Sequence, residues 1–193
     1  MKQGWEFKQL GDICNIVNGG TPKSSISEYW NGNNLWITPK DMGKLSSVFV
    51  DDTARKITDQ GLQDSSAKLL PAYSLILSSR APIGYLAINT KPISTNQGCK
   101  GVIPSNKINY LYLYYFLKKS VKLLNELGTG ATFKELSSTK LNSVSIPIPS
   151  IEIQKEIVAK LDQIFAAIDT AKINIEKNLE NAKELFQSKL NEI

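Results

Sequence analysis

The chain has 193 residues, of which 23 are Lys or Arg, 18 are Asp or Glu, two are Cys and none is His, giving a formal net charge of +5. This profile, with 41% hydrophobic residues, is typical of a soluble globular protein of one or two domains. The missing histidine excludes a Ser-His-Asp triad, a Cys-His pair and imidazole zinc sites, and the sequence has no CxxC pair and no nucleotide-binding glycine loop. We therefore expect no catalytic residue, no metal site and no cofactor.

Short strands separated by turns are predicted for residues 1–104, because apolar runs alternate there with Gly, Asn and Pro. Cys14 and Cys99 are expected to be buried thiols. Residues 6–8 are interpreted as an exposed N-terminal strand. The other expected strands are 13–17, 35–38, 47–50, 74–78, 83–88 and 101–103.

A helical pattern follows over residues 107–127, with one broad apolar face. Its aromatic side chains suit either a base-stacking platform or a core, and the helical spacing favours the core. These aromatic residues are Tyr110, Tyr112, Tyr114, Tyr115 and Phe116. Residues 143–148 alternate as a strand, and Pro147 and Pro149 indicate an edge strand or an entry segment.

From Ser150 to the end, the sequence predicts a single helix without Gly or Pro. Apolar residues recur with a mean step of about 3.6, so they form a stripe on one face of a nearly straight helix. At ~1.5 Å per residue the helix is about 60 Å long, which exceeds what the preceding body can cover, so we expect a partner helix in a coiled coil. The residues expected to face it are Ile157, Leu161, Ile164, Ile168, Ile175, Leu179, Phe186 and Leu190.

Charge is distributed unevenly along the chain. Residues 151–193 carry six Lys and eight acidic groups, whereas residues 1–150 carry 17 basic and ten acidic groups. A surplus of +7 on the body suits a polyanion partner, although a basic surface also serves solubility alone. No run of about 18 apolar residues is present, and residues 1–12 lack the apolar core of a signal peptide. We expect no membrane span and a cytoplasmic location.

An ordered series of short motifs resembles the DNA specificity (S) subunit of Type I restriction-modification systems, and the resemblance covers essentially the whole chain. The fragments are weak singly, but their order is specific. They are Trp5, Leu10-Gly11-Asp12-Ile13, Gly19-Gly20-Thr21-Pro22, Tyr29-Trp30, Trp36-Ile37-Thr38-Pro39-Lys40-Asp41, Ser79-Arg80-Ala81-Pro82-Ile83-Gly84, Asn96-Gln97-Gly98, Gly130-Ala131-Thr132, Ile146-Pro147-Ile148-Pro149, Gln154-Lys155-Glu156-Ile157-Val158 and Leu161-Asp162.

The resemblance implies an α+β fold, with a globular target recognition domain over residues 1–149 and one long spacer helix over 150–193. S subunits of this family usually carry two such units in tandem, with antiparallel spacer helices, so that each domain reads one half of a split DNA target. Here each motif occurs once, which resembles half an S subunit or a fragment of a longer one. The implied partners are double-stranded DNA, modification and restriction subunits, and a second copy or another half-subunit. The resemblance also implies that the partner subunits methylate adenine and cut DNA and that this chain itself is non-catalytic.

Loop residues near the recognition-type turns are the candidates for DNA contact, because Lys suits phosphates, Asn and Gln suit adenine edges, and Arg suits guanine. Each has a structural alternative: Gly19–Pro22 as a plain turn, Asp41 as a cap, Arg80 as a partner of a carboxylate, Asn96 as a tie between loops. The candidates are Thr21, Lys23, Ser24, Lys40, Asp41, Arg80, Asn96, Gln97, Lys100, Thr132 and Lys134.

Two other classes of function stay open at this stage. One is a stand-alone dimeric DNA-binding or regulatory protein that uses the helix only for pairing. The other is a nuclease that uses carboxylates alone, which the absence of any clustered acidic motif disfavours.

Overall fold

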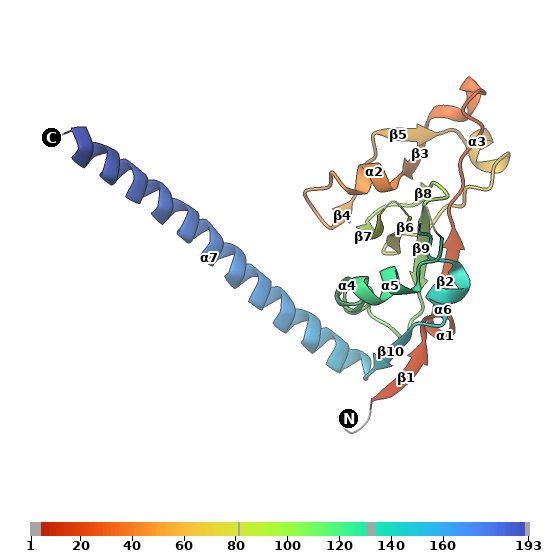
Figure 1. Ribbon diagram of the computed structural model, residues 1–193. Coiled ribbons are helices and arrows are strands. Elements are labelled where there is room, and N and C mark those ends of the chain that lie inside the picture. The colour runs from red at the N-terminus through yellow and green to blue at the C-terminus, as the bar shows by residue number, and fades with distance from the viewer. Residues whose placement is uncertain (1–4, 81, 131–133, 192–193) are drawn as a thin grey trace. The chain divides into compact units, whose positions relative to one another are not determined.

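A computed structural model describes residues 5–80, 82–130 and 134–191 (Figure 1). The chain divides into two compact units, one ending at Gln154 and one starting at Lys155. The first unit mixes strands with short helices, and the second belongs to one long helix. This confirms the expected α+β class with a long C-terminal helix. The predicted domain boundary between residues 149 and 150 stays a prediction.

A five-stranded sheet forms the centre of the first unit, in the order β2-β9-β6-β7-β4. Neighbouring strands are antiparallel except for β4, which runs parallel to β7. The central strand β6 is buried along its whole length. The bounds are β2 Cys14–Asn18, β4 Phe49–Val50, β6 Leu75–Ser79, β7 Ile83–Asn89 and β9 Cys99–Pro104. Each overlaps a strand that the sequence predicts.

Two smaller sheets complete the unit. In the first, β3 (Trp30–Ile37) pairs antiparallel with β5 (Arg55–Ile57) and parallel with β8 (Ile93–Thr95). In the second, β1 (Glu6–Gln9) pairs antiparallel with β10 (Ser145–Ile148). The exposed N-terminal strand and the edge position of the proline-containing strand are thereby confirmed. The sequence did not predict β5 and β8, because three residues are too few to show an alternating pattern.

Alternate residues of β3 supply two separate cores. Leu35 and Ile37 join a cluster with Ile76 of β6 and Ile93 of β8, which fills the space between the three-stranded and five-stranded sheets. Trp36 faces the other way and packs with Ile57. Both cysteines are free and buried, as expected, and burial raises the pKa of each thiol to about 12.

The helical pattern predicted for residues 107–127 forms two helices, α4 (Tyr110–Lys119) and α5 (Val121–Leu127). Ser120 interrupts the run because its ψ of 3° leaves the helical path while its N–H bonds to Phe116 and Leu117 carbonyls. Tyr112 and Tyr114 are buried, which confirms the interpretation as core for these two, whereas Tyr110, Tyr115 and Phe116 are partly buried. The Tyr112 hydroxyl donates to the Pro147 carbonyl at 2.8 Å and so fastens α4 to β10.

Short helices occupy several connections that the sequence left as turns. Most begin at a polar cap, such as Thr38, whose hydroxyl accepts from the Asp41 N–H at the start of α2. These helices are α1 Leu10–Ile13, the 3-10 turn η1 Ser27–Tyr29, α2 Pro39–Met42, α3 Asp59–Gln63 and α6 Ser138–Asn142.

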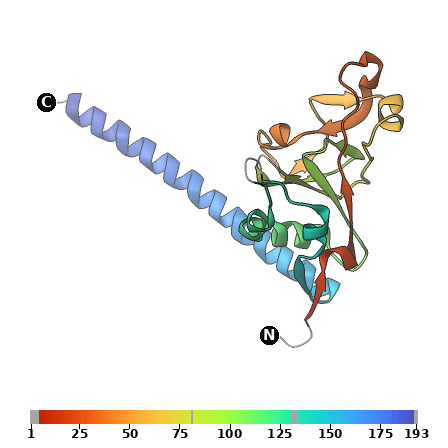
Figure 2. The same ribbon diagram turned by 45° about the vertical axis from the view of Figure 1, so that its right-hand side comes forward.

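The long helix α7 spans Ile151–Asn191 without a break, as both views show (Figures 1 and 2). The Ser150 hydroxyl accepts from the Ile153 N–H at 3.4 Å, which is the expected N-cap position. In the first turn the buried Gln154 side chain accepts from the Asn109 N–H and donates to the carbonyls of Lys107 and Pro149. Every described residue of α7 after Leu161 is exposed.

Gly19 and Gly20 pass through a space in which a side chain does not fit. A Cβ on Gly19 would lie 1.9 Å from the Asn96 carbonyl oxygen, and a Cβ on Gly20 would lie 2.2 Å from the Ser66 carbonyl carbon. The Gly20 carbonyl also accepts from the buried Trp36 indole at 3.0 Å. This glycine pair is therefore required for a close approach of backbones, and not for a turn alone.

The substitution Gly20→Ala should lower the free energy of unfolding by about 1–3 kcal/mol or more, because backbone atoms of Ser66 and Ala67 must move. Urea unfolding measures the change. Gly43→Ala is the matched control, because Gly43 is exposed, has a helical φ of −66° and faces only the Tyr85 ring at 3.1 Å. Equal losses in the two variants would contradict this account.

Candidate nucleic-acid interface

Strand register gathers separate turns at one end of the five-stranded sheet. Asn18 pairs with Lys100, and Ser78 pairs with Cys99. The loop after β2, the turn before β9 and the residue after β6 must therefore lie together. We call Asn18–Thr21, Arg80 and Asn96–Gly98 the loop cluster.

The N-terminus of α2 adjoins the loop cluster. Strands β3 and β8 run parallel with Ile37 opposite Thr95, so both chains leave the three-stranded sheet at the same end. The Asn96 N–H donates to the Ile37 carbonyl at 3.0 Å, and a Cβ on Gly98 would lie 3.0 Å from Cγ of Pro39. Lys40 follows Pro39 directly and is exposed.

Side-chain and backbone contacts fix the loop cluster internally. The Thr21 hydroxyl donates to the side-chain oxygen of Gln97, and both residues are exposed. Asn96 accepts from the Gly98 N–H at 3.0 Å through its side-chain oxygen. The Gly98 carbonyl in turn accepts from Ser79, from its N–H at 2.8 Å and its hydroxyl at 3.2 Å. These hydrogen bonds therefore fix the backbone that carries polar groups able to contact base edges.

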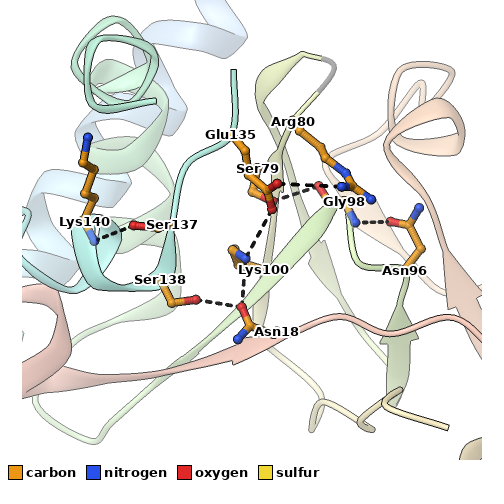
Figure 3. Close-up of polar contacts among 10 residues, drawn as sticks. All are labelled: Asn18, Ser79, Arg80, Asn96, Gly98, Lys100, Glu135, Ser137, Ser138 and Lys140. Atoms are coloured by element: carbon orange, nitrogen blue, oxygen red, sulfur yellow. Dashed lines mark hydrogen bonds and ion pairs between the residues drawn. The ribbon is translucent and has the colours of Figure 1, made fainter. Parts of the chain in front are cut away.

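A chain of polar contacts runs from Arg80 into the body (Figure 3). Nη1 of Arg80 lies 3.7 Å from Oε2 of Glu135, whose Oε1 lies 4.0 Å from Nζ of Lys100. Lys100 donates to the Asn18 side-chain oxygen at 2.8 Å, and that oxygen also accepts from the Ser138 hydroxyl at 2.7 Å. Five residues from five segments are therefore linked.

Lys100 is unusual among the lysines because its side chain is only 8% exposed. Burial lowers its pKa; Glu135 acts in the opposite direction, whereas Arg80 lowers the pKa further. Beside it lies a hollow of about 480 Å³, lined by Asn18, Lys100, Thr129, Glu135, Ser137 and Ser138. The Lys100 ammonium group therefore contacts Asn18 and Glu135 of the same chain.

The predicted residues therefore occupy different environments. Thr21, Arg80, Asn96 and Gln97 come together in the loop cluster, and Lys40 adjoins it. The Asp41 carboxylate accepts from the N–H and hydroxyl of Thr38, so it caps α2, which is the structural alternative. Three more candidates are exposed: Lys23, Ser24 and Lys134. Thr132 lies outside the described residues.

Sequence reasoning missed the partners of the predicted cations. Asn18 ends β2, and Ser138 lies 120 positions away, so no local pattern connects them. It also missed Arg55, whose guanidinium carbon lies 3.9 Å from the Trp30 ring centroid and 4.8 Å from that of Trp36. Only the scarcity of arginine, with Arg55 and Arg80 alone in the chain, gave a signal.

Predicted helix-contact residues of α7 fall into two groups. Ile157 and Leu161 are partly buried. The remaining six are exposed: Ile164, Ile168, Ile175, Leu179, Phe186 and Leu190.

Neither a metal-binding cluster nor a membrane-spanning helix is present among the described residues. Within residues 5–80, 82–130 and 134–191, no three His, Cys, Asp or Glu side chains group in a way that suits a metal ion. In the same ranges, no helix combines the length and the apolar character that a membrane crossing requires.

Comparisons with known proteins agree with this architecture. Curated relatives include the specificity subunit of the Type I restriction enzyme MjaIX from Methanocaldococcus jannaschii, 37% identical over 95% of this chain and 43% of the relative. The specificity subunit of EcoR124I/EcoR124II from Escherichia coli is 35% identical over 94% of this chain and 45% of its own length. The chain thus spans less than half of these relatives.

Solved structures give the same result. The HsdS subunit from Thermoanaerobacter tengcongensis superposes with a TM-score of 0.70 at 25% identity, over 89% of this chain and 40% of that subunit. A chain from a structural study of complex assembly and conformational transition of the Type I restriction-modification system gives a TM-score of 0.71 at 29% identity, over 94% of this chain and 44% of that chain. The family model of the Type I restriction modification DNA specificity domain matches residues 2–181. The chain therefore belongs to this family of DNA specificity domains.

Proposed function

We propose that this chain is a non-catalytic DNA recognition subunit of a Type I restriction-modification complex. It reads one half of a bipartite target in the cytoplasm and directs adenine methylation or cleavage by modification and restriction subunits. The observation that carries the proposal is the loop cluster: exposed or partly exposed polar side chains from three separate connections meet on a fixed backbone in a body with surplus lysine. Lysines neutralise phosphates and set the register, while the polar loop side chains contact base edges.

Selection from randomised DNA duplexes tests this function. The 193-residue chain, alone and with the modification subunits, should enrich one short sequence motif. Without those subunits it should transfer no methyl group from S-adenosylmethionine. Lys40→Gln should weaken binding about equally for all sequences and reduce its salt dependence, because a phosphate contact carries no base information. A chain that enriches no sequence in either form, or that methylates DNA alone, would refute the proposal.

We further propose that the exposed stripe of α7 pairs with an equivalent helix, from a second copy or from another half-subunit. Apolar side chains at helical spacing remain in water on the chain by itself, and an antiparallel partner helix covers them. Antiparallel pairing also keeps the two basic bodies at opposite ends of the pair, where their repulsion is smallest.

Two isoleucines provide a matched test of this pairing. Ile175 lies on the stripe and is 67% exposed, whereas Ile173 lies about 200° away around the helix and is 64% exposed. Ile175→Lys should dissociate the pair, because it places an ammonium group in the apolar contact, and Ile173→Lys should leave the mass unchanged. Analytical ultracentrifugation measures both. A monomeric wild type, or dissociation by both substitutions alike, would contradict the stripe as the contact.

Helix length limits the distance between two half-sites. A helix of 41 residues is about 60 Å long, which corresponds to at most ~18 base pairs. Insertion of seven residues between Ala171 and Ile175 adds ~10 Å and nearly preserves the stripe, so the selected gap should grow by about three base pairs. The half-site sequences should stay the same, since the loop cluster is untouched. For a homodimer, sequencing of selected duplexes should show an interrupted palindrome. An unchanged gap would count against the spacer role.

A further inference from the structure

We propose that Glu135 and Lys100 are positioning residues for Arg80, and that Arg80 determines specificity by reading a guanine in the major groove. This inference rests on the proposed function, because it assigns one base contact within it. Lys100 acts through Glu135, and only Arg80 contacts the DNA.

The chemistry of Arg80 suits this role. A guanidinium group recognises guanine by donating two N–H bonds to O6 and N7. The ion pair with Glu135, at 3.7 Å, is longer than a hydrogen bond, so it restrains the group without consuming its donors. The Arg80 side chain keeps 36% of its surface exposed, at the same sheet end as Thr21 and Gln97. Arg80 is therefore held in place and still open to a base.

The backbone fixes Glu135 next to Arg80. Thr129 and Glu135 exchange backbone hydrogen bonds of 3.0 and 2.8 Å, and the Leu136 N–H donates to the Ser79 carbonyl at 2.9 Å. Arg80 and Glu135 themselves form an isolated antiparallel bridge. The backbone position of Glu135 is therefore fixed, and only the side-chain torsions decide where its carboxylate lies.

Lys100 sets those torsions. A strand position that is 8% exposed is normally filled by an apolar residue, which costs less to bury than an ammonium group. Lys100 instead spans from Asn18, to which it donates at 2.8 Å, to Oε1 of Glu135 at 4.0 Å. The oxygen that faces Lys100 is thus distinct from Oε2, which faces Arg80. Two cations hold the two ends of one carboxylate.

Such restraint has a direct consequence for recognition. Arginine loses rotamer freedom when it binds, and a side chain that is already oriented loses less. A neutral residue in place of Glu135 frees the guanidinium, so discrimination at one base pair falls. General attraction to phosphates rises at the same time, because a negative charge is removed beside DNA.

The test is duplex selection with the full chain and its modification subunits, comparing variants by their preference at each base pair. Arg80→Lys keeps the charge but loses the planar fork, so preference for guanine at one position should fall roughly 5- to 150-fold. Glu135→Gln should lower preference at the same position and leave the other positions unchanged. The double variant Arg80→Lys, Glu135→Gln should lose no more than Arg80→Lys alone. Lys100→Met should reproduce the effect of Glu135→Gln.

Matched controls separate positioning from charge and from folding. Glu126→Gln removes the same charge from an exposed site on α5 and should leave every base preference unchanged. If Lys100→Met does not fold, Glu135→Gln still decides the question, because Glu135 is largely accessible with 44% of its side chain exposed. Wild-type preference in Glu135→Gln, a change at a different base pair, or additive losses in the double variant would overturn the inference while leaving the proposed function intact. If the wild type enriches no sequence, the proposed function fails, and this inference fails with it.

Discussion

The antiparallel pairing of β9 with both β2 and β6 is the constraint on which the rest of the first unit depends. It places Asn18, Lys100 and Leu77 at one level of the sheet, with Cys99 and Ser78 one residue further along, so three connections distant in sequence must turn in the same small volume. That volume is crowded, which is why Gly19 has no room for a Cβ beside the Asn96 carbonyl. The strand register and the glycine pair are thus two aspects of the same packing, and this packing positions the polar side chains of the loop cluster.

The charged groups at this end of the sheet differ in exposure. The Lys100 side chain is buried and paired, whereas the side chains of Arg80 and Glu135 are partly exposed. A buried ion pair contributes little net stability compared with apolar packing, so its value lies in the orientation that it imposes. The lysines that remain exposed, such as Lys23, Lys40 and Lys134, are free of this role and suit phosphate contacts. Orientation and general attraction therefore come from different residues.

Local patterns predicted the strands of the five-stranded sheet and the long helix, and they missed the shortest elements and the contacts between segments. The helix expected from Ser150 onward spans Ile151–Asn191, because a 3.6-residue period needs no information from elsewhere in the chain. The break at Ser120 was missed, since one residue with ψ near zero does not disturb the apolar pattern of α4 and α5. Lys100 was predicted as a loop residue for DNA contact and lies buried in β9. No local pattern could show this, because its partner Asn18 is 82 positions away. Asp41 was recognisable as a capping residue from Thr38 three positions earlier, and it is one.

The long helix divides the proposed work in a way that follows from its composition. Residues 151–193 carry a small negative balance, so this segment adds no attraction to phosphates, and its exposed apolar stripe needs a protein surface instead. A helix in a protein gains most of its stability from packing of such a face, so the partner that covers the stripe also rigidifies the helix. Rigidity is what a spacer requires, because a flexible connection between two readers sets no fixed distance. The loop cluster then determines sequence preference and the length of α7 determines half-site spacing. Each property can change without altering the other.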